Sequence, residues 1–317
     1  MPPVLPLPVV TTFAEVEQGH AVQGLRSGRV ELRMVPALGG RIIGLRSLDS
    51  DREWCWHRPE EQWLWPSAPG SGFGDACQAG LDECVPTVAA CEVKGRALPD
   101  HGEVWCQRWE LDPEALAANI LQATVDLPVS PLRFTRTIRA DGFGAFRFDY
   151  ALENLGTESE PFLWSLHPLT TLEPGDRLEL PAEVQSLRLD GGLGAFIQRG
   201  DVWAYPEPFP GVRLDACEVP GMPKGCVKGF AGPLRLGQAA LVNGTTGDRL
   251  SLRWDAAEVP YLGIWINRGH CGFHHVALEP TTGAPDALAE AWGDRWGQPR
   301  VLAPGGTTRW SITVEVS

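Results

Sequence analysis

The nine residues FRFDYALEN, at positions 146–154, alternate apolar and polar side chains over almost their whole length. In an extended chain successive side chains point to opposite faces, so Phe146, Phe148, Tyr150 and Leu152 share one face. This period of two predicts a strand that buries one face and exposes the other, as strands of antiparallel sheets commonly do.

The same alternation occurs toward both ends of the chain, in RVELRMV at 29–35 and in WSITVEV at 310–316. Turn-forming pairs such as Asn243-Gly244 stand between the apolar runs, at spacings that fit hairpins and meanders. The last strand is too apolar on one face to hang free, so we expect it to complete a sheet.

Windows that could form helices are short, and the two best are PEALAANI at 113–120 and PDALAEAW at 285–292. Neither repeats after a strand as parallel βαβ units require. No repeat, charge run or change of composition marks a domain boundary. We therefore expect an all-β fold of antiparallel strands in a single domain over residues 1–317.

The composition limits the classes of partner. Of the 317 residues 43% are hydrophobic and 21% are charged, which is enough for a large core, and the formal net charge is -13. Nucleic acids and anionic membranes attract clustered Lys and Arg, and the sequence has no basic run, so we expect neither as a partner. No uncharged apolar stretch reaches the roughly 18 residues of a membrane span.

The eight cysteines show no C-x-x-C pair or other short regular spacing. A chain of this length does not depend on disulfides, so we expect reduced, mostly buried thiols in a cytoplasmic protein. The sequence does not fix the oligomeric state, and a homodimer stays open.

Four polar clusters interrupt the apolar and turn-rich pattern. They are GLDECVPTV at 80–88, LPDHGEVW at 98–105, FLWSLHPL at 162–169 and HHVALEPTTG at 274–283.

His167 and Glu279 each end an apolar run just before a proline. An ionisable group in such a position needs a partner or a purpose. A hydrogen-bonded core histidine would explain His167 alone, but Glu is among the residues least often buried without a partner. A partly desolvated carboxylate with an imidazole favours acid–base chemistry on a neutral, polyhydroxylated molecule.

The strings LPDHGEVW, FLWSLHPL and VALEPTTG, in this order and at these separations, resemble the aldose 1-epimerase (galactose mutarotase-like) superfamily, especially its bacterial aldose epimerase-like branch. GGRIIGLRSL at 39–48 is similar to the family's opening strand pair, and GLDECVPTV takes the place of its segment before the first histidine. The resemblance covers about residues 30–316. It implies a galactose mutarotase-like β-supersandwich with an open, concave sugar-binding face.

By motif position, the resemblance implies that Glu279 is the base that takes the proton of the anomeric hydroxyl. His167 would be the acid that protonates the ring oxygen, and His101 a hydrogen-bonding and electrostatic helper. Opening a hemiacetal needs an acceptor at one oxygen and a donor at the other, with the roles reversed on closure, so the chemistry agrees with a separate acid and base. It needs no metal, cofactor or nucleophile.

The stretch KGCVKGFAG at 224–232 departs from the family, in which an aspartate of this region helps to bind sugar hydroxyls. Lys224 and Lys228 stand here instead, and a lysine facing the substrate would suit an acidic sugar, whereas a solvated loop lysine is the alternative. Family members that act on hexose phosphates tend to carry an arginine shortly after the first histidine, while here Arg108 comes later.

Four further residues are candidates for substrate binding. Asp82 and Glu83 point to opposite faces of an extended segment, so we expect one in the cleft and the other on a backbone amide or an arginine such as Arg41. For Arg41 a structural ion pair and sugar binding stay open. Among the 13 Trp, Trp105 is the first choice for an aromatic floor under a sugar ring.

His270 and His274 have helical spacing, and Cys271 and His275 accompany them. The segment contains glycine and has the pattern of a hairpin, and no further ligands or supporting groups can be named, so we expect no metal site.

Three functions stay open: an enzyme that interconverts sugar anomers, a non-catalytic carbohydrate-binding or regulatory protein, and an isomerase acting on an acidic sugar. The presence of both His167 and Glu279 favours catalysis, because binding alone does not need a matched acid and base. Fold by itself does not decide among them.

Overall fold

The computed structural model describes residues 9–193, 197–216, 225–293 and 296–317, so Lys224 lies outside the described residues. The elements in chain order are β1 (Val10–Glu17), β2 (His20–Ser27), β3 (Val30–Val35), β4 (Arg41–Ser47), η1 (Phe73–Asp75), β5 (Leu81–Cys84), β6 (Cys91–Val93), β7 (Arg96–Leu98), β8 (Glu110–Leu111), α1 (Pro113–Ala117), β9 (Leu121–Asp126), β10 (Leu132–Ala140), β11 (Ala145–Asn154), β12 (Glu160–Phe162), β13 (Ser165–Pro168), β14 (Thr170–Thr171), β15 (Asp176–Glu179), β16 (Ser186–Leu193), β17 (Val202–Ala204), β18 (Gly225–Ala231), β19 (Gly237–Asn243), β20 (Arg249–Trp254), β21 (Tyr261–Arg268), η2 (His270–Gly272), β22 (His274–Thr281), η3 (Leu288–Glu290), β23 (Arg300–Leu302) and β24 (Thr307–Val316).

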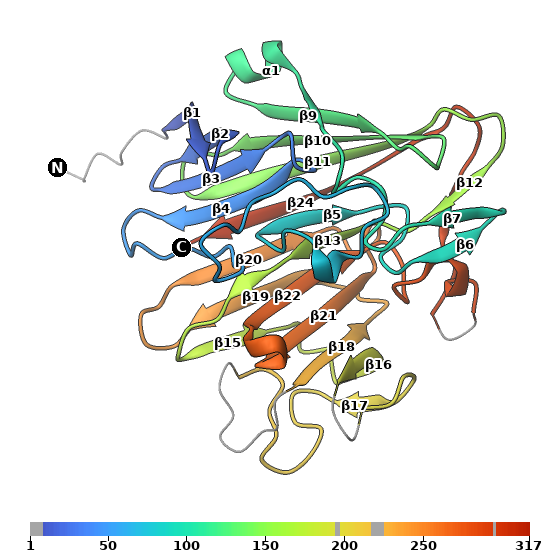
Figure 1. Ribbon diagram of the computed structural model, residues 1–317. Coiled ribbons are helices and arrows are strands. Elements are labelled where there is room, and N and C mark those ends of the chain that lie inside the picture. The colour runs from blue at the N-terminus through green and yellow to red at the C-terminus, as the bar shows by residue number, and fades with distance from the viewer. Residues whose placement is uncertain (1–8, 194–196, 217–224, 294–295) are drawn as a thin grey trace.

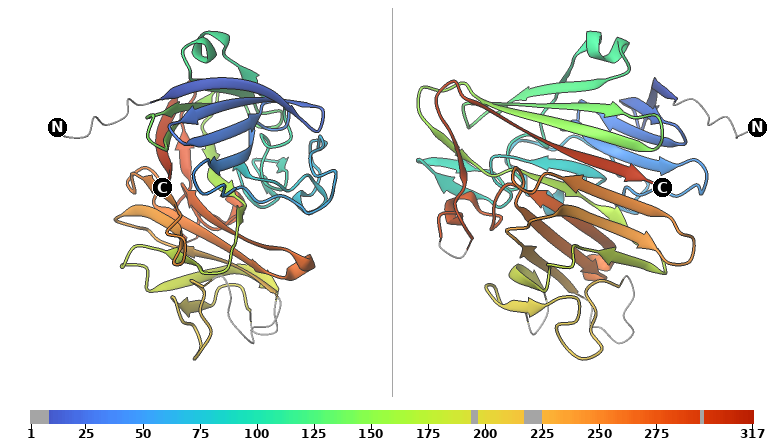
Figure 2. Two further views of the ribbon diagram at one scale, coloured as in Figure 1. Left: turned by 90° about the vertical axis from the view of Figure 1, so that its left-hand side faces the viewer. Right: turned by 180° about the vertical axis from the view of Figure 1, so that it is seen from behind.

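Two large sheets make up most of the described chain (Figures 1 and 2). The larger sheet has twelve strands in the order β1-β2-β3-β4-β5-β13-β22-β21-β18-β16-β17, with β14 paired to β22. The smaller sheet has eight strands in the order β15-β19-β20-β24-β11-β10-β9-β8. The strands of both sheets pair antiparallel, for example β21 with β22 and β10 with β11. The expectation of an all-β, antiparallel fold is confirmed.

The stretch FRFDYALEN forms most of β11, which pairs with β10 on one side and with the C-terminal strand β24 on the other. Phe146, Phe148, Tyr150 and Leu152 are all buried, so the alternation marks the face of this strand that packs into the core. β24 lies between β20 and β11, as expected for a strand that completes a sheet.

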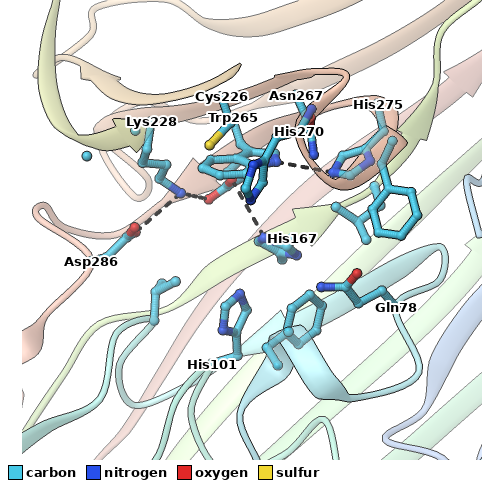
Figure 3. A pocket seen from close by; sticks show the side chains of 18 of the residues that line it. Gln78, His101, His167, Cys226, Lys228, Trp265, Asn267, His270, His275 and Asp286 are labelled. Carbon is cyan, nitrogen blue, oxygen red and sulfur yellow. Dashed lines mark hydrogen bonds and ion pairs between the residues drawn. The ribbon is translucent and has the colours of Figure 1, made fainter. Parts of the chain in front are cut away.

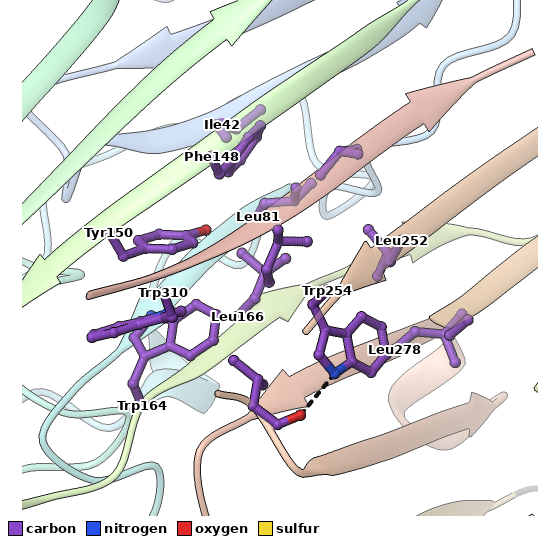
Figure 4. Packing of buried hydrophobic residues seen from close by; sticks show 14 of the residues in the cluster. Ile42, Leu81, Phe148, Tyr150, Trp164, Leu166, Leu252, Trp254, Leu278 and Trp310 are labelled. Carbon is purple, nitrogen blue, oxygen red and sulfur yellow. Dashed lines mark hydrogen bonds between the residues drawn. The ribbon is translucent and has the colours of Figure 1, made fainter. Parts of the chain in front are cut away.

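The main core lies between the two sheets. It joins side chains of the larger sheet, such as Leu166 and Leu278, to side chains of the smaller one, such as Phe148, Leu252 and Trp254 (Figure 4). This packing takes up one face of the larger sheet, so side chains that alternate with the core residues on β13, β22, β21 and β18 project from its other face.

The two helical windows differ from each other. Residues 113–117 form α1, whose N-terminus is capped by Asp112 accepting hydrogen bonds from two backbone amides. The window 285–292 holds only the single 3-10 turn η3. The carbonyl of Asp286 accepts hydrogen bonds from the amides of Val88 and Ala89, so the start of this segment is tied to a neighbouring loop rather than to a helix of its own.

No helix within the described residues is long and apolar enough to cross a membrane. Cys55, Cys77 and Cys84 are buried free thiols.

Candidate active site

A pocket of about 480 Å³ opens on the face of the larger sheet that is turned away from the core, a volume in the range of small-molecule sites. Figure 3 shows His101, His167, Lys228 and Asp286 around this pocket, and Glu279 also lines it. The structure therefore brings together His101, His167 and Glu279, which are far apart in the sequence.

Neighbouring strands supply the central side chains. His167 comes from β13, Glu279 from β22 and Lys228 from β18, and these strands lie in the order β13-β22-β21-β18. On β21 between them, Gly263 is opposite Glu279 and Trp265 is opposite Lys228. A Cβ at position 263 would lie 3.2 Å from Glu279 Oε2, so glycine at this position leaves room for the carboxylate.

Glu279 is fully buried, and its two oxygens differ. Oε2 accepts a hydrogen bond from Lys228 Nζ, whereas Oε1 has no hydrogen-bond partner among the described residues and lies 3.9 Å from His167 Nε2. Burial raises the pKa of Glu279, and the charge of Lys228 acts in the opposite direction. One carboxylate oxygen therefore lies at the wall of the pocket next to an imidazole, without a hydrogen bond to any of the described residues.

His167 is buried, and its Nδ1 has no hydrogen-bond partner in the part of the chain that the structure describes. Burial, reinforced by the nearby charges of His101 and Lys228, holds the pKa of His167 well below its usual range. The ring is thus neutral near pH 7, and it is a strong acid once it is protonated.

His101 lies on the turn at 98–105 and has a left-handed backbone with φ of 59°. Its Nδ1 donates to Asp100 Oδ1 over 2.9 Å, and its ring stacks on Phe73 with 3.9 Å between centroids. The next residue, Gly102, also has positive φ, and a Cβ there would lie 2.4 Å from the carbonyl oxygen of Val85. The unusual backbone and these contacts fix the ring 4.8 Å from that of His167, between ring centroids.

Lys228 is buried between two carboxylates. Besides Glu279, it pairs with Asp286 Oδ1 at 3.3 Å. It is therefore not a solvated loop lysine, and its charge is already paired with carboxyl groups of the protein.

Aromatic side chains also line the pocket, namely Phe73, Trp265 and Phe273. Trp265 is half-buried, and its Nε1 donates to His275 Nε2 over 3.2 Å. Burial lowers the pKa of His275 to about 3, so this histidine is neutral at physiological pH.

Similar folds occur among solved structures. A "putative aldose 1-epimerase" from Escherichia coli K12 is 18% identical, with a TM-score of 0.67 over 98% of this chain and 99% of that one. A galactose mutarotase-like protein from Lactobacillus casei is 17% identical, with a TM-score of 0.62 over 96% and 100% of the two chains. The galactose mutarotase related enzyme from Lactobacillus acidophilus is 14% identical, with a TM-score of 0.64 over 97% of each.

The chain has the galactose mutarotase-like fold. The resemblance expected from the sequence is therefore confirmed at the level of the fold. No protein-family model matches the chain. The search of curated proteins finds no match either.

Within this galactose mutarotase-like fold, Arg41, Asp82 and Glu83 do not line the pocket. Arg41 Nε donates to Asp82 Oδ1 over 2.7 Å, and both side chains are buried. Glu83 binds Arg136 and Trp164 on the core side. The expectation that one of the two acids reaches the cleft is not met, because neither lines the pocket, although Asp82 Oδ2 has no hydrogen-bond partner among the described residues. Of the two roles left open for Arg41, the ion pair is the one observed.

Trp105 is also absent from the pocket surface, because it is buried beneath Phe73. Its Nε1 donates to the carbonyl of Asp100 over 3.0 Å, so it supports the turn that carries His101. The half-buried Trp265 has the exposure that a sugar platform needs.

Sequence reasoning missed Asp286, which lies in the window considered as a helix and reaches the pocket through a loop. The one available signal was its acidic side chain directly after Pro285, shortly beyond the VALEPTTG string. Within the described residues, no group of three or more His, Cys, Asp and Glu could hold a metal ion.

Proposed function

We propose that this protein is an aldose 1-epimerase-like isomerase that interconverts the anomers of an uncharged sugar. The observation that carries the proposal is the buried Glu279, with one unpartnered oxygen 3.9 Å from a buried imidazole in a sugar-sized pocket. Leaving buried polar atoms without partners costs stability, so their presence together in a pocket favours a ligand that satisfies them.

The two reacting oxygens of a cyclic sugar, O1 and O5, are bonded to the same carbon and so lie close together. Glu279 Oε1 would take the proton from O1 while the protonated ring of His167 gives a proton to O5 and becomes neutral, and the C1–O5 bond breaks to give the open-chain aldehyde. Rotation about C1–C2 and closure with the proton movements reversed give the other anomer. Because the pKa of His167 lies well below its usual range, only a small fraction of the rings is protonated near pH 7, and each protonated ring is a strong acid.

His101 would bind a sugar hydroxyl. Its Nδ1 is engaged with Asp100, which leaves Nε2 for the ligand. Trp265 would supply an apolar surface for the C–H face of the ring.

The arrangement of Lys228 argues against an acidic sugar. The reason for considering one was a lysine facing the substrate, but the charge of Lys228 is already shared by the carboxyl groups of Glu279 and Asp286. An added carboxylate or phosphate beside them would be repelled.

The test is anomer interconversion measured by NMR saturation transfer, with a panel of neutral and acidic sugars and with correction for the spontaneous rate. We expect a neutral aldose to interconvert faster with the protein than in buffer. If a sugar binds but none in the panel is accelerated, the protein is a carbohydrate-binding protein and the proposal is wrong. Acceleration of acidic sugars alone would contradict the substrate class.

A further inference from the structure

The described chain contains two lysines that each join two carboxylates, and their surroundings differ. Lys228 Nζ contacts Glu279 and Asp286 inside the pocket, and its side chain is 8% exposed. Lys94 Nζ contacts Glu158 at 2.9 Å and Glu160 at 3.0 Å, and its side chain is 33% exposed. Lys94 does not line the pocket. A surface bridge of this kind contributes little, whereas a buried one strongly affects its partners.

We propose that Lys228, held by Asp286, is a positioning residue that fixes and keeps ionised the carboxylate of Glu279. The inference rests on the proposed function, in which Glu279 is the base. It assigns a role to Asp286 and gives Lys228 a different role from substrate binding.

The contacts of Lys228 support the first part of the proposal, that this residue fixes the orientation of the Glu279 carboxylate. Lys228 binds Oε2 of Glu279, and this leaves Oε1 on the side of His167. A carboxylate held at one oxygen presents the other in a defined place, which general-base catalysis requires. Asp286 holds the ammonium from another segment, so the Lys228 side chain is restrained at its charged end.

The charges around Glu279 support the second part of the proposal, that Lys228 keeps this carboxylate ionised. A base must be ionised at the working pH, and burial acts against this by raising the pKa of Glu279. The charge and hydrogen bond of Lys228 lower that pKa, while the negative charge of Asp286 raises it. The two neighbours therefore act in opposite directions on one carboxylate.

The other titratable groups around Glu279 are His167 from β13, His101 from its turn and Cys84 from β5. His101 lowers the pKa of Glu279. All three stay unchanged in the variants below, so any difference between variants comes from Lys228 or Asp286.

The experiment compares the pH profiles of kcat/KM for anomer interconversion in the wild type, Lys228→Met and Asp286→Asn. An opposite charge in contact with a carboxyl group shifts its pKa by about 1 to 3 units, so the acidic limb of Lys228→Met should move up by about 1 to 3 pH units. At neutral pH this variant should lose kcat with little change in KM, and activity should return at higher pH. In Asp286→Asn the acidic limb should move down.

Lys94→Met is the matched control, because it removes a lysine that also joins two carboxylates but lies outside the pocket. Its profile should coincide with that of the wild type. A purely structural role for Lys228 would reduce the amount of folded enzyme without moving either limb, and that result would overturn the proposal. Equal shifts in the same direction for both pocket variants would overturn it as well.

A second measurement does not depend on turnover. With glutamate labelled by ¹³C at the side-chain carboxyl, the Glu279 signal is assigned by its loss in Glu279→Gln and is then titrated in each protein. We expect its pKa to rise in Lys228→Met and to fall in Asp286→Asn, and no change in either would contradict the proposal. If no sugar is interconverted, the proposed function fails, while the titration still decides whether Lys228 sets the charge of Glu279. Should Lys228→Met not fold, Asp286→Asn carries both measurements.

Discussion

Glu83 and Glu279 are both 0% exposed, both lie on central strands of the larger sheet, and both face a cation. They differ in how their oxygens are used. Glu83 Oε1 accepts from Arg136 over 3.0 Å and Oε2 accepts from Trp164 over 2.8 Å. Glu279 has one oxygen bound to Lys228 and one that no described residue binds by a hydrogen bond.

This difference separates a structural carboxylate from a candidate catalytic one. A buried charge whose hydrogen bonds are all made rigidifies the core and has nothing left to offer a ligand. A buried charge with a free lone pair costs stability until a ligand binds it, and such sites are candidates for function. Burial and residue type are the same in the two cases, so only the partners distinguish them.

The largest effect that we predict from this comparison of Glu83 with Glu279 is a loss of stability in the variant Glu83→Gln. The change leaves Arg136 buried without an opposite charge, and we expect the free energy of unfolding to fall by about 3–5 kcal/mol. Urea denaturation measures it. Glu158→Gln, at the exposed Lys94 bridge, is the control and should change it by less than about 1 kcal/mol. A loss of under about 1 kcal/mol in Glu83→Gln as well would contradict the structural role.

The second-largest effect that we predict is a loss of turnover in the variant Glu279→Gln. The amide keeps the shape of the side chain but is not a base, so the rate of anomer interconversion should fall by about 10² or more, which corresponds to about 2.7 kcal/mol of transition-state stabilisation. Sugar binding and the free energy of unfolding should change much less, because Lys228 keeps Asp286 as a partner. Rates and binding constants for the same sugar check this.

His167→Asn completes that test. It removes the proposed proton donor, and the double variant should be little slower than the slower single one, because a general acid and a general base in one step act as one unit. If Glu279→Gln keeps most of the activity, the base is misassigned. Asp82 and Glu83 lie outside the pocket, so Asp286 would then be the carboxylate to test.

The sequence predicted which face of a strand is buried, but not which distant residues pair with the buried acidic side chains. Alternation in 146–154 correctly marked the core face of β11, and the strings around His101, His167 and Glu279 named three side chains that the fold brings together. A strand pattern cannot show which distant residue meets a buried acid. Arg136 is 53 residues from Glu83, and Lys228 is 51 residues from Glu279.

The sequence also does not show whether a side chain that lies close to a predicted site residue in the chain faces the pocket. Trp105 follows His101 by four residues, and nothing in LPDHGEVW shows that its ring lies under the turn rather than in the pocket. The sequence did not mark Asp286 as a pocket residue, because the apolar residues after it favoured a helix. In the structure this segment forms a loop with a single 3-10 turn, and the carbonyl of Asp286 accepts hydrogen bonds from the neighbouring loop.

His275 combines the features of the two glutamates: its Nε2 accepts a hydrogen bond from Trp265, as the oxygens of Glu83 accept theirs, whereas its Nδ1 has no hydrogen-bond partner within the described residues. Burial lowers its pKa to about 3, whereas an unfolded histidine has a pKa of about 6.5. The unfolded chain therefore binds the proton first as the pH falls, so this histidine leaves stability unchanged above about pH 6.5 and lowers it progressively toward pH 3. Between pH 7 and pH 5 it should lower the free energy of unfolding by about 2 kcal/mol.

The variant His275→Gln can still accept a hydrogen bond from Trp265 but does not titrate. The free energy of unfolding of this variant should therefore fall less between the two pH values, by that amount. Urea denaturation of both proteins at pH 7 and pH 5 measures the difference, and the opposite contribution of Glu83, whose pKa burial raises to about 6, cancels because both proteins contain it. Equal losses in the two proteins would show that His275 is free to take up a proton in the folded state, and that its unpartnered nitrogen reaches water.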